Sequence, residues 1–127
     1  TQVITTTSMP VQTAVPVQQY ANGGGNYNGC QYPMSPSNFS SAKQTIENET
    51  FSDTKLSTAQ SIVSSNCLTS DQILNIAQLF TFENDKLAFA KMAYQSCVDR
   101  NNYFKVVNAF TYSSSKQDLN NYIQSMR

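Results

Sequence analysis

Glycine and proline are confined to one end of this 127-residue chain. All four glycines and all four prolines lie within residues 1–36, and residues 37–127 contain neither. Because these two residues break regular structure most strongly, their absence from the longer part favours continuous helix. We therefore predict an all-α domain over residues 37–127, preceded by a flexible, low-complexity arm over residues 1–36.

The predicted arm is rich in Thr, Val, Gln, Asn, Gly and Pro, and it contains no charged residue. A segment of this composition buries too little apolar surface to form a core, so it is typical of a linker. The chain begins at Thr1 rather than at a methionine. We therefore expect that a signal or lipid-bearing segment was removed, and that such a segment tethers or exports the domain.

Apolar residues in the longer part follow a helical period. Residues 73–80 place apolar side chains at i, i+3, i+4 and i+7, and residues 103–110 repeat this pattern thirty residues later. A stripe of this spacing forms one face of a helix. The periodicity predicts six short helices, at residues 37–48, 53–66, 70–80, 84–98, 101–110 and 114–126. Short connections favour hairpins, so we expect three stacked hairpins with a repeat of about 30 residues.

Helix start signals agree with these positions. Ser35 precedes Pro36, which suits an N-cap followed by proline at the first helical position. Thr69 lies three residues before Gln72, the spacing of a capping box. Asp99 and Ser113 are further N-cap candidates, because Asp and Ser are favoured at that position.

A short motif recurs at residues 50–55, 81–86 and 111–116: Thr, an aromatic residue, three polar residues and Lys. With Ser52 as an N-cap, Phe51 is at N′ and Leu56 at N4, the spacing of a hydrophobic staple. Phe82 and Leu87 share this spacing, and Tyr112 is the third aromatic. We expect these aromatic side chains to be buried at the hairpin corners.

The lysines of the motif, Lys55, Lys86 and Lys116, are harder to explain. A cation in the first helical turn faces the positive end of the helix dipole, which is mildly unfavourable. One hypothesis is structural, with an acidic side chain or a helix carbonyl offsetting the charge. The other is a ladder of lysines that binds an anionic polymer or phosphate. The Tyr94–Tyr103 neighbourhood is a second candidate binding surface, expected to be exposed, and burial of these tyrosines in the core is the alternative.

Several pieces of the sequence together resemble a known family. They are Thr69–Ser70–Asp71–Gln72–Ile73, Phe80-x-Phe82 followed by Lys86–Leu87, Asp99 with Tyr103, and Phe110-x-Tyr112. Over roughly residues 29–123 the chain is similar to the uncharacterised domain-of-unknown-function family four-four-seven-six. The family is known mostly from exported bacterial proteins, with some animal members, and carries no established activity. The resemblance therefore implies a helical fold and an extracytoplasmic location, and it transfers no catalytic residue.

In the oxidising compartment that the resemblance implies, two of the three cysteines, Cys30, Cys67 and Cys97, can form a disulfide. Cys67 and Cys97 lie near the ends of equivalent predicted helices, which pack about 8–10 Å apart. A disulfide needs Cα atoms within about 7 Å, so that pair is disfavoured. We predict a disulfide between Cys30 and Cys67, with Cys97 as a buried free thiol. Three free thiols are the alternative.

The composition of the chain argues against several classes of function. Net charge is zero and no basic stripe is visible, which argues against nucleic-acid binding. No apolar run approaches the roughly 20 residues that span a bilayer. The chain has no histidine, so it lacks the usual base for a cysteine nucleophile and the usual ligand for zinc. We expect no cofactor and no metal.

We therefore predict a non-enzymatic, exported binding or scaffold module of the cell envelope, in the periplasm, at the outer membrane or secreted. Its partner is expected to be a protein or a glycan, contacted through the helical array. Two alternatives stay open. One is an envelope enzyme, such as a glycan hydrolase that uses carboxylates, and the other is a peptide-binding assembly or stress factor.

Overall fold

The computed structural model describes residues 30–126, and these residues form an all-α fold. The elements in chain order are α2 (Pro36–Glu47), α3 (Ser52–Ser65), α4 (Ser70–Ala77), α5 (Glu83–Ala93), η1 (Tyr94–Ser96), η2 (Arg100–Ala109) and α6 (Ser113–Ser125). Elements labelled η are 3₁₀ helices. The predicted all-α class is confirmed. Most of the predicted arm, residues 1–29, lies outside the described residues.

All six predicted helical segments are present, with differences at their ends. The segment expected at 84–98 is α5 followed by the short η1, and the one expected at 70–80 stops at Ala77. The segment expected at 101–110 is a 3₁₀ helix rather than an α-helix. Its sequence, RNNYFKVVNA, consists largely of Asn, aromatic and β-branched residues, which are weak α-helix formers. Hydrophobic periodicity locates a helix, but it does not distinguish these two helix types.

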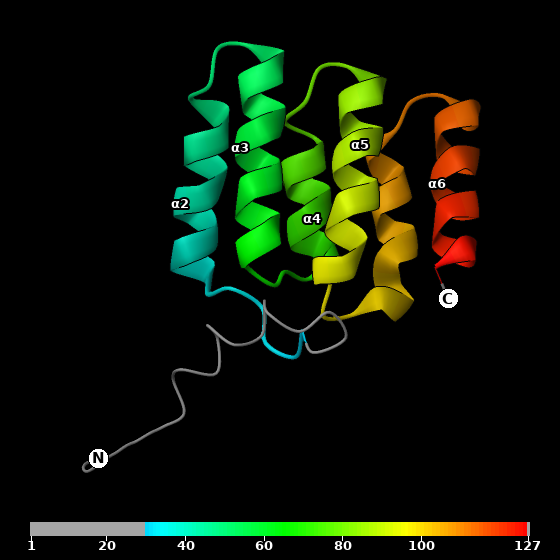
Figure 1. Cartoon of the computed structure of the whole chain (residues 1–127), viewed down its shortest axis with the longest axis horizontal. Helices are drawn as coiled ribbons and strands as arrows, with labels where there is room; N and C mark the ends of the chain where they lie inside the picture. Colours follow the sequence, from blue (N-terminus) through cyan, green and yellow to red (C-terminus); the bar gives the residue numbers. More distant parts are fainter. Residues whose placement is uncertain (1–29, 127) are drawn as a thin grey trace.

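The helices form two rows that pack against each other (Figure 1). In one row α5 contacts both α3 and α6, and in the other α4 contacts both α2 and η2. The connections α2–α3, α4–α5 and η2–α6 lie at one end of the molecule, at the top of Figure 1. We call this the upper end. Residues 30–35 and the connections α3–α4 and α5–η2 lie at the opposite, lower end.

The core lies between the two rows and receives apolar side chains from every helix. Its fully buried members include Ile46, Ile73, Phe89 and Leu119. Because each row presents one apolar stripe and neither stripe is covered within its own row, packing the rows together removes both from water.

The tyrosine pair Tyr94 and Tyr103 belongs to this core. The two side chains are only 4% and 1% exposed, and their rings meet edge to face with centroids 4.9 Å apart. The Tyr103 hydroxyl donates a 2.6 Å hydrogen bond to the Ala90 carbonyl, and burial raises the pKa of Tyr103 well above its ordinary value. The expectation of an exposed binding surface here is therefore wrong, because both side chains are buried between the helices, and the Tyr94 ring also contacts Tyr122 of α6.

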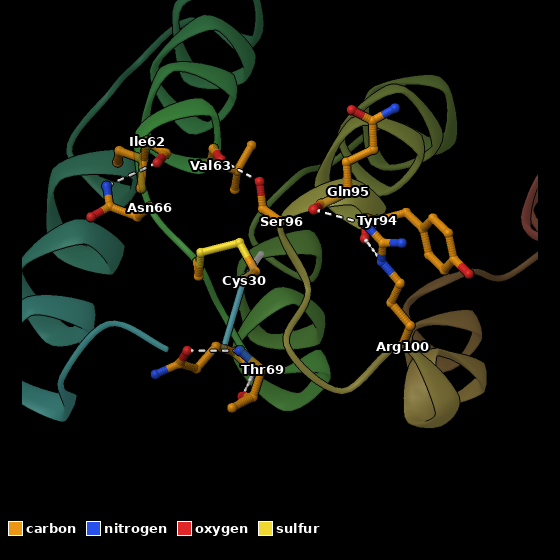
Figure 2. The surroundings of a disulfide bond; sticks show 11 residues. Cys30, Ile62, Val63, Asn66, Thr69, Tyr94, Gln95, Ser96 and Arg100 are labelled. Atoms are coloured by element: carbon orange, nitrogen blue, oxygen red, sulfur yellow. Dashed lines mark hydrogen bonds between the residues drawn. A yellow bond between two sulfur atoms is a disulfide. The ribbon is translucent and has the colours of Figure 1, made fainter. Parts of the chain in front are cut away.

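A disulfide joins Cys30 to Cys67 at the lower end, with Cα atoms 5.6 Å apart (Figure 2). This is the predicted pairing. The backbone N–H of Met34 donates to the Cys67 carbonyl at 2.7 Å, and the Gln72 side chain donates to the Met34 carbonyl at 3.3 Å. Residues 30–35, the last part of the predicted arm, are thus fastened to the α3–α4 connection. The predicted Ser35 cap and the Thr69–Gln72 capping box are both present beside them.

Cys97 is a buried free thiol, also as predicted. It lies beside Leu68, where two connections run parallel: Leu68 N–H donates to the Ser96 carbonyl, and Val98 N–H donates to the Leu68 carbonyl, each at 2.9 Å. Burial, helped by the neighbouring Asp99, raises the pKa of the Cys97 thiol to about 12. At neutral pH the thiol is therefore protonated, and it fills space as a small apolar side chain.

Candidate functional site

The repeated aromatic–lysine motif lies at the upper end, at the first residues of α3, α5 and α6. In each case the aromatic residue is the N-cap, with extended backbone angles near φ −97° (−96°, −98° and −96°). Its carbonyl accepts the first helical hydrogen bond, which comes from the backbone N–H of the lysine four residues later. The spacing of the motif is therefore the spacing of one helical turn.

This geometry corrects the expected hydrophobic staple. Ser52 is the first helical residue and not the N-cap, so the aromatic lies one position closer to the helix than predicted. Phe51 is 72% exposed, Phe82 57% and Tyr112 60%, so the expected burial at the corners is wrong. None of the three aromatic side chains makes a capping hydrogen bond. Leu56 and Leu87 are partly buried and pack against the core.

The lysines bridge to the neighbouring helix of the other row. The Lys55 amine donates to the Leu79 carbonyl at 3.4 Å, and the Lys86 amine donates to the Ala109 carbonyl at 2.9 Å. Both carbonyls lie at or just past the C-terminal end of a helix, α4 and η2 respectively, where backbone acceptors lack helical partners. Each lysine amine thus donates to a free carbonyl at the negative, C-terminal end of one helix, while its own backbone lies in the first turn of another helix. The favourable first contact offsets the unfavourable position of a cation in a first turn.

Lys116 occupies the equivalent position on α6. Within residues 30–126 no further helix follows α6, and the Lys116 amine has no carbonyl partner of this kind there. The structural hypothesis therefore accounts for Lys55 and Lys86. A ligand-binding role for the three lysines stays a prediction.

Glu83, the residue after Phe82, links α5 to the start of α6. Its carboxylate accepts hydrogen bonds from the backbone N–H groups of Thr111 at 3.0 Å and Tyr112 at 3.2 Å. The Lys86 amine lies 3.8 Å away. Burial alone would raise the pKa of Glu83, but these hydrogen bonds, one from Ser115 and the Lys86 charge outweigh it and lower the pKa. The carboxylate is therefore ionised and holds the backbone of Tyr112 in place.

Asp99 plays a similar part at the lower end. Its carboxylate accepts from the backbone N–H of Ser70 at 2.7 Å and from the Ser70 hydroxyl at 2.9 Å, so it caps α4 from the connection between η1 and η2. Asn102 and the Cys97 thiol donate to it as well. Burial opposes ionisation, but the donors prevail and the pKa of Asp99 is lowered. Asp99 is the N-cap residue of η2 as predicted, but its carboxylate accepts from the backbone of α4 and makes no capping hydrogen bond to the backbone of η2.

An open cleft of about 480 Å³ lies between the starts of α5 and α6. Phe82 and Tyr112 contribute to its lining, together with the hydroxyl and amide side chains of Thr81, Asn84, Thr111 and Ser114. The cleft thus combines two exposed aromatic side chains with uncharged hydrogen-bonding groups. The sequence motif marks both aromatics but does not indicate this cleft, because the exposure of the two rings depends on the exact helix start.

Two structural carboxylates escaped prediction from the sequence. The sequence offers Glu83 as an acidic partner for a motif lysine and Asp99 as the cap of its own helix, but it does not indicate the contacts of either carboxylate with another helix. One signal in the sequence sets Glu83 apart: it follows its aromatic residue at the position where Ser52 and Ser113 follow the other two aromatics. Among the described residues no group of His, Cys, Asp and Glu is arranged to hold a metal ion. In the same part of the chain, no helix combines the length and the apolar character that crossing a bilayer requires.

The family of this chain follows from its similarity to known protein sequences. A search of curated proteins finds no match, and a search of solved structures finds none. The family model described as Domain of unknown function (DUF4476) matches residues 33–123, which include all of the helix starts and both clusters described above. This match confirms the resemblance seen in the sequence. The chain belongs to the DUF4476 family.

Proposed function

We propose that this protein is a non-enzymatic, exported module of the cell envelope that binds a protein or glycan partner through its upper end. The binding surface consists of Phe51, Phe82 and Tyr112, which we call the aromatic edge. The proposal covers a binding or scaffold role and no chemical step.

The observation that carries the proposal is the repeated exposure of an aromatic residue at three N-caps. None of these side chains makes a capping hydrogen bond, although Ser, Thr, Asp or Asn in that position would add about 0.5–2 kcal/mol of stability. None contributes to the core. Single exposed aromatics are ordinary, but a row of them at equivalent positions on one end supports a contact surface.

The disulfide supports the proposed location. Disulfides persist in secreted and periplasmic proteins and are rare in reducing compartments. The Cys30–Cys67 bond fastens residues 30–35 to the domain, so it has a structural use that an oxidising compartment would preserve. The disulfide thus supports the proposed location outside the cytoplasm, in the periplasm, at the outer membrane or secreted.

The two carboxylates that link neighbouring helices, Glu83 and Asp99, have structural rather than catalytic surroundings. A carboxylate-based glycan hydrolase needs a general acid whose pKa is raised. Glu83 and Asp99 instead have lowered pKa values, and both accept hydrogen bonds from backbone N–H groups at the ends of neighbouring helices. Groups held in this way stabilise the fold and are poor proton donors.

The test compares the full chain with the triple variant Phe51→Ala/Phe82→Ala/Tyr112→Ala in co-sedimentation with envelope fractions of the source organism. The matched control is Phe104→Ala, because Phe104 is 64% exposed but lies within η2, away from the three helix starts. We expect the triple variant to lose binding and the control to keep it. Equal binding by the triple variant and the unmodified chain would contradict the proposal.

A further inference from the structure

The cleft between α5 and α6 has a chemical character that specifies a ligand class. It is open to solvent, and Phe82 and Tyr112 lie among its lining residues. The side chains of Thr81, Asn84, Thr111 and Ser114 supply hydroxyl and amide groups. Such groups act both as hydrogen-bond donors and as acceptors.

The two charged side chains of the cleft neutralise each other. The Glu83 carboxylate accepts from two backbone N–H groups, and the Lys86 amine donates to the Ala109 carbonyl while lying 3.8 Å from Glu83. Their side chains are only 15% and 14% exposed. An anionic ligand would need a free cation, and a cationic ligand a free carboxylate. The cleft instead suits a ligand without charge.

These contacts also fix the walls of the cleft. Glu83, from the first turn of α5, holds the backbone of Thr111 and Tyr112, and Lys86 holds the end of η2. The Tyr112 ring is thus carried on backbone whose position is set by two residues of α5. A site built on fixed backbone loses less conformational entropy when it binds.

We propose that this cleft binds a neutral glycan, an inference that rests on the proposed binding function of the aromatic edge. A pyranose ring has apolar C–H faces and a rim of hydroxyl groups. The faces stack on aromatic rings, and the hydroxyls exchange hydrogen bonds with Ser, Thr and Asn side chains. Proteins instead bind a peptide segment along an exposed strand edge or in an apolar groove. The mixture of aromatic and uncharged polar groups here matches the saccharide.

The aromatic edge extends the site in one direction. Because α5 packs against both α3 and α6, Phe51 is the next aromatic after Phe82 along the same row. Packed helices lie about 8–10 Å apart, a distance that a linear oligosaccharide of several units covers. Affinity for a linear glycan is therefore expected to rise with chain length, until the glycan reaches from Tyr112 to Phe51.

The experiment exposes the full chain to one envelope fraction after two treatments: protease digestion, and periodate oxidation, which cleaves the vicinal diols of sugars. We expect binding to survive digestion and to be lost after periodate. Tyr112→Ala should weaken binding to the digested fraction about tenfold, which corresponds to about 1.4 kcal/mol, and Phe104→Ala should leave it unchanged. Because the ligand is neutral, raising the salt concentration should not weaken binding.

The outcomes separate this inference from the function on which it rests. Binding that is lost after digestion, survives periodate and needs the aromatic edge would overturn the glycan and leave the binding module standing with a protein partner. Binding that falls steeply with salt would overturn the neutral ligand. Binding that is unaffected by the triple aromatic variant would overturn both. Thermal melting of each variant, monitored by circular dichroism, verifies that the fold is intact.

Discussion

The side-chain amine of Lys86 donates a 2.9 Å hydrogen bond to the backbone carbonyl of Ala109, the last residue of η2. Lys86 thus lies in the first turn of α5, and its side chain caps the C-terminal end of η2 in the other row. Lys55 makes the corresponding contact with Leu79 at the longer distance of 3.4 Å. The two contacts tie successive parts of the array together at the upper end.

Replacing Lys86 should therefore destabilise the protein. In Lys86→Met the aliphatic stem remains, but the Ala109 carbonyl loses a charged donor, and we expect a loss of about 1–3 kcal/mol in the free energy of unfolding. Lys116→Met is the matched control, since Lys116 has the same place on α6 without this partner, and should stay within about 0.5 kcal/mol of the unmodified chain. Urea denaturation measures both. Equal losses in the two variants would show that the bridge does not stabilise the fold.

The exposed aromatics should matter little for stability. Phe82→Ala removes a ring that is 57% exposed, so we expect a change below about 1 kcal/mol, whereas Phe89→Ala opens a cavity in the core and should cost about 3–5 kcal/mol. Thermal and urea unfolding of the two variants give the comparison. If Phe82→Ala were as damaging as Phe89→Ala, the ring would be a structural plug rather than part of a contact surface.

Acid should weaken the two carboxylate clusters. The pKa values of Glu83 and Asp99 in the folded state lie below their ordinary values of 4.5 and 3.8. As pH falls through those values the unfolded chain binds protons first, so the stabilisation is complete at neutral pH and is lost progressively in acid. Glu83→Gln should be less stable than the unmodified chain at pH 7, and the difference should shrink toward pH 3. Denaturation curves across this range test the sign. A difference that does not depend on pH would contradict it.

Removing the disulfide should produce a large loss of stability. Cys30 and Cys67 are 37 residues apart, and closing a loop of that size stabilises a fold by about 4 kcal/mol according to the chain-entropy model. We expect Cys30→Ser to lower the free energy of unfolding by roughly this amount while the helical circular dichroism signal persists. Cys97→Ala is the control, because it removes a cysteine without opening a loop. A Cys30→Ser variant as stable as the unmodified chain would mean that residues 30–35 hold their place without the bond.

Cys97 should resist alkylation in the native protein. Its thiol is 3% exposed and has a pKa of about 12, so almost no thiolate is present at pH 8. Iodoacetamide should modify it at the rate at which the protein unfolds, and quickly in urea, as followed by mass spectrometry. Rapid labelling of the folded chain would reveal an opening of the lower end.

Some of this architecture was predictable because it follows from local chemistry. The absence of Gly and Pro after residue 36 indicated helices, and the Thr69–Gln72 box and the Ser35–Pro36 pair marked two helix starts correctly. In these cases a residue type has one dominant physical role, and its neighbours in the sequence decide the outcome. The predicted disulfide rested instead on the oxidising compartment that the resemblance implies. The spacing of about 8–10 Å assumed for Cys67 and Cys97 did not anticipate that Leu68, the residue after Cys67, pairs with Cys97.

The upper end was not predictable in the same way. Moving a helix start by one residue converts Phe51 from a buried staple into an exposed N-cap, and the sequence pattern tolerates either choice. Likewise, Lys86 and Glu83 act on residues 23 to 29 positions further along the chain. Such contacts depend on how the rows pack, which periodicity alone does not determine.

The place of the disulfide has a mechanical consequence. The bond joins Cys30, in the segment before α2, to Cys67, in the connection that follows α3. A pull on the chain upstream of Cys30 therefore passes through the covalent bond and cannot peel α2 and α3 away one at a time. The aromatic edge begins at the other end of α3, about 20 Å along the helix axis for its 14 residues. A domain held from its N-terminal side would therefore keep its proposed binding surface directed outward while under load.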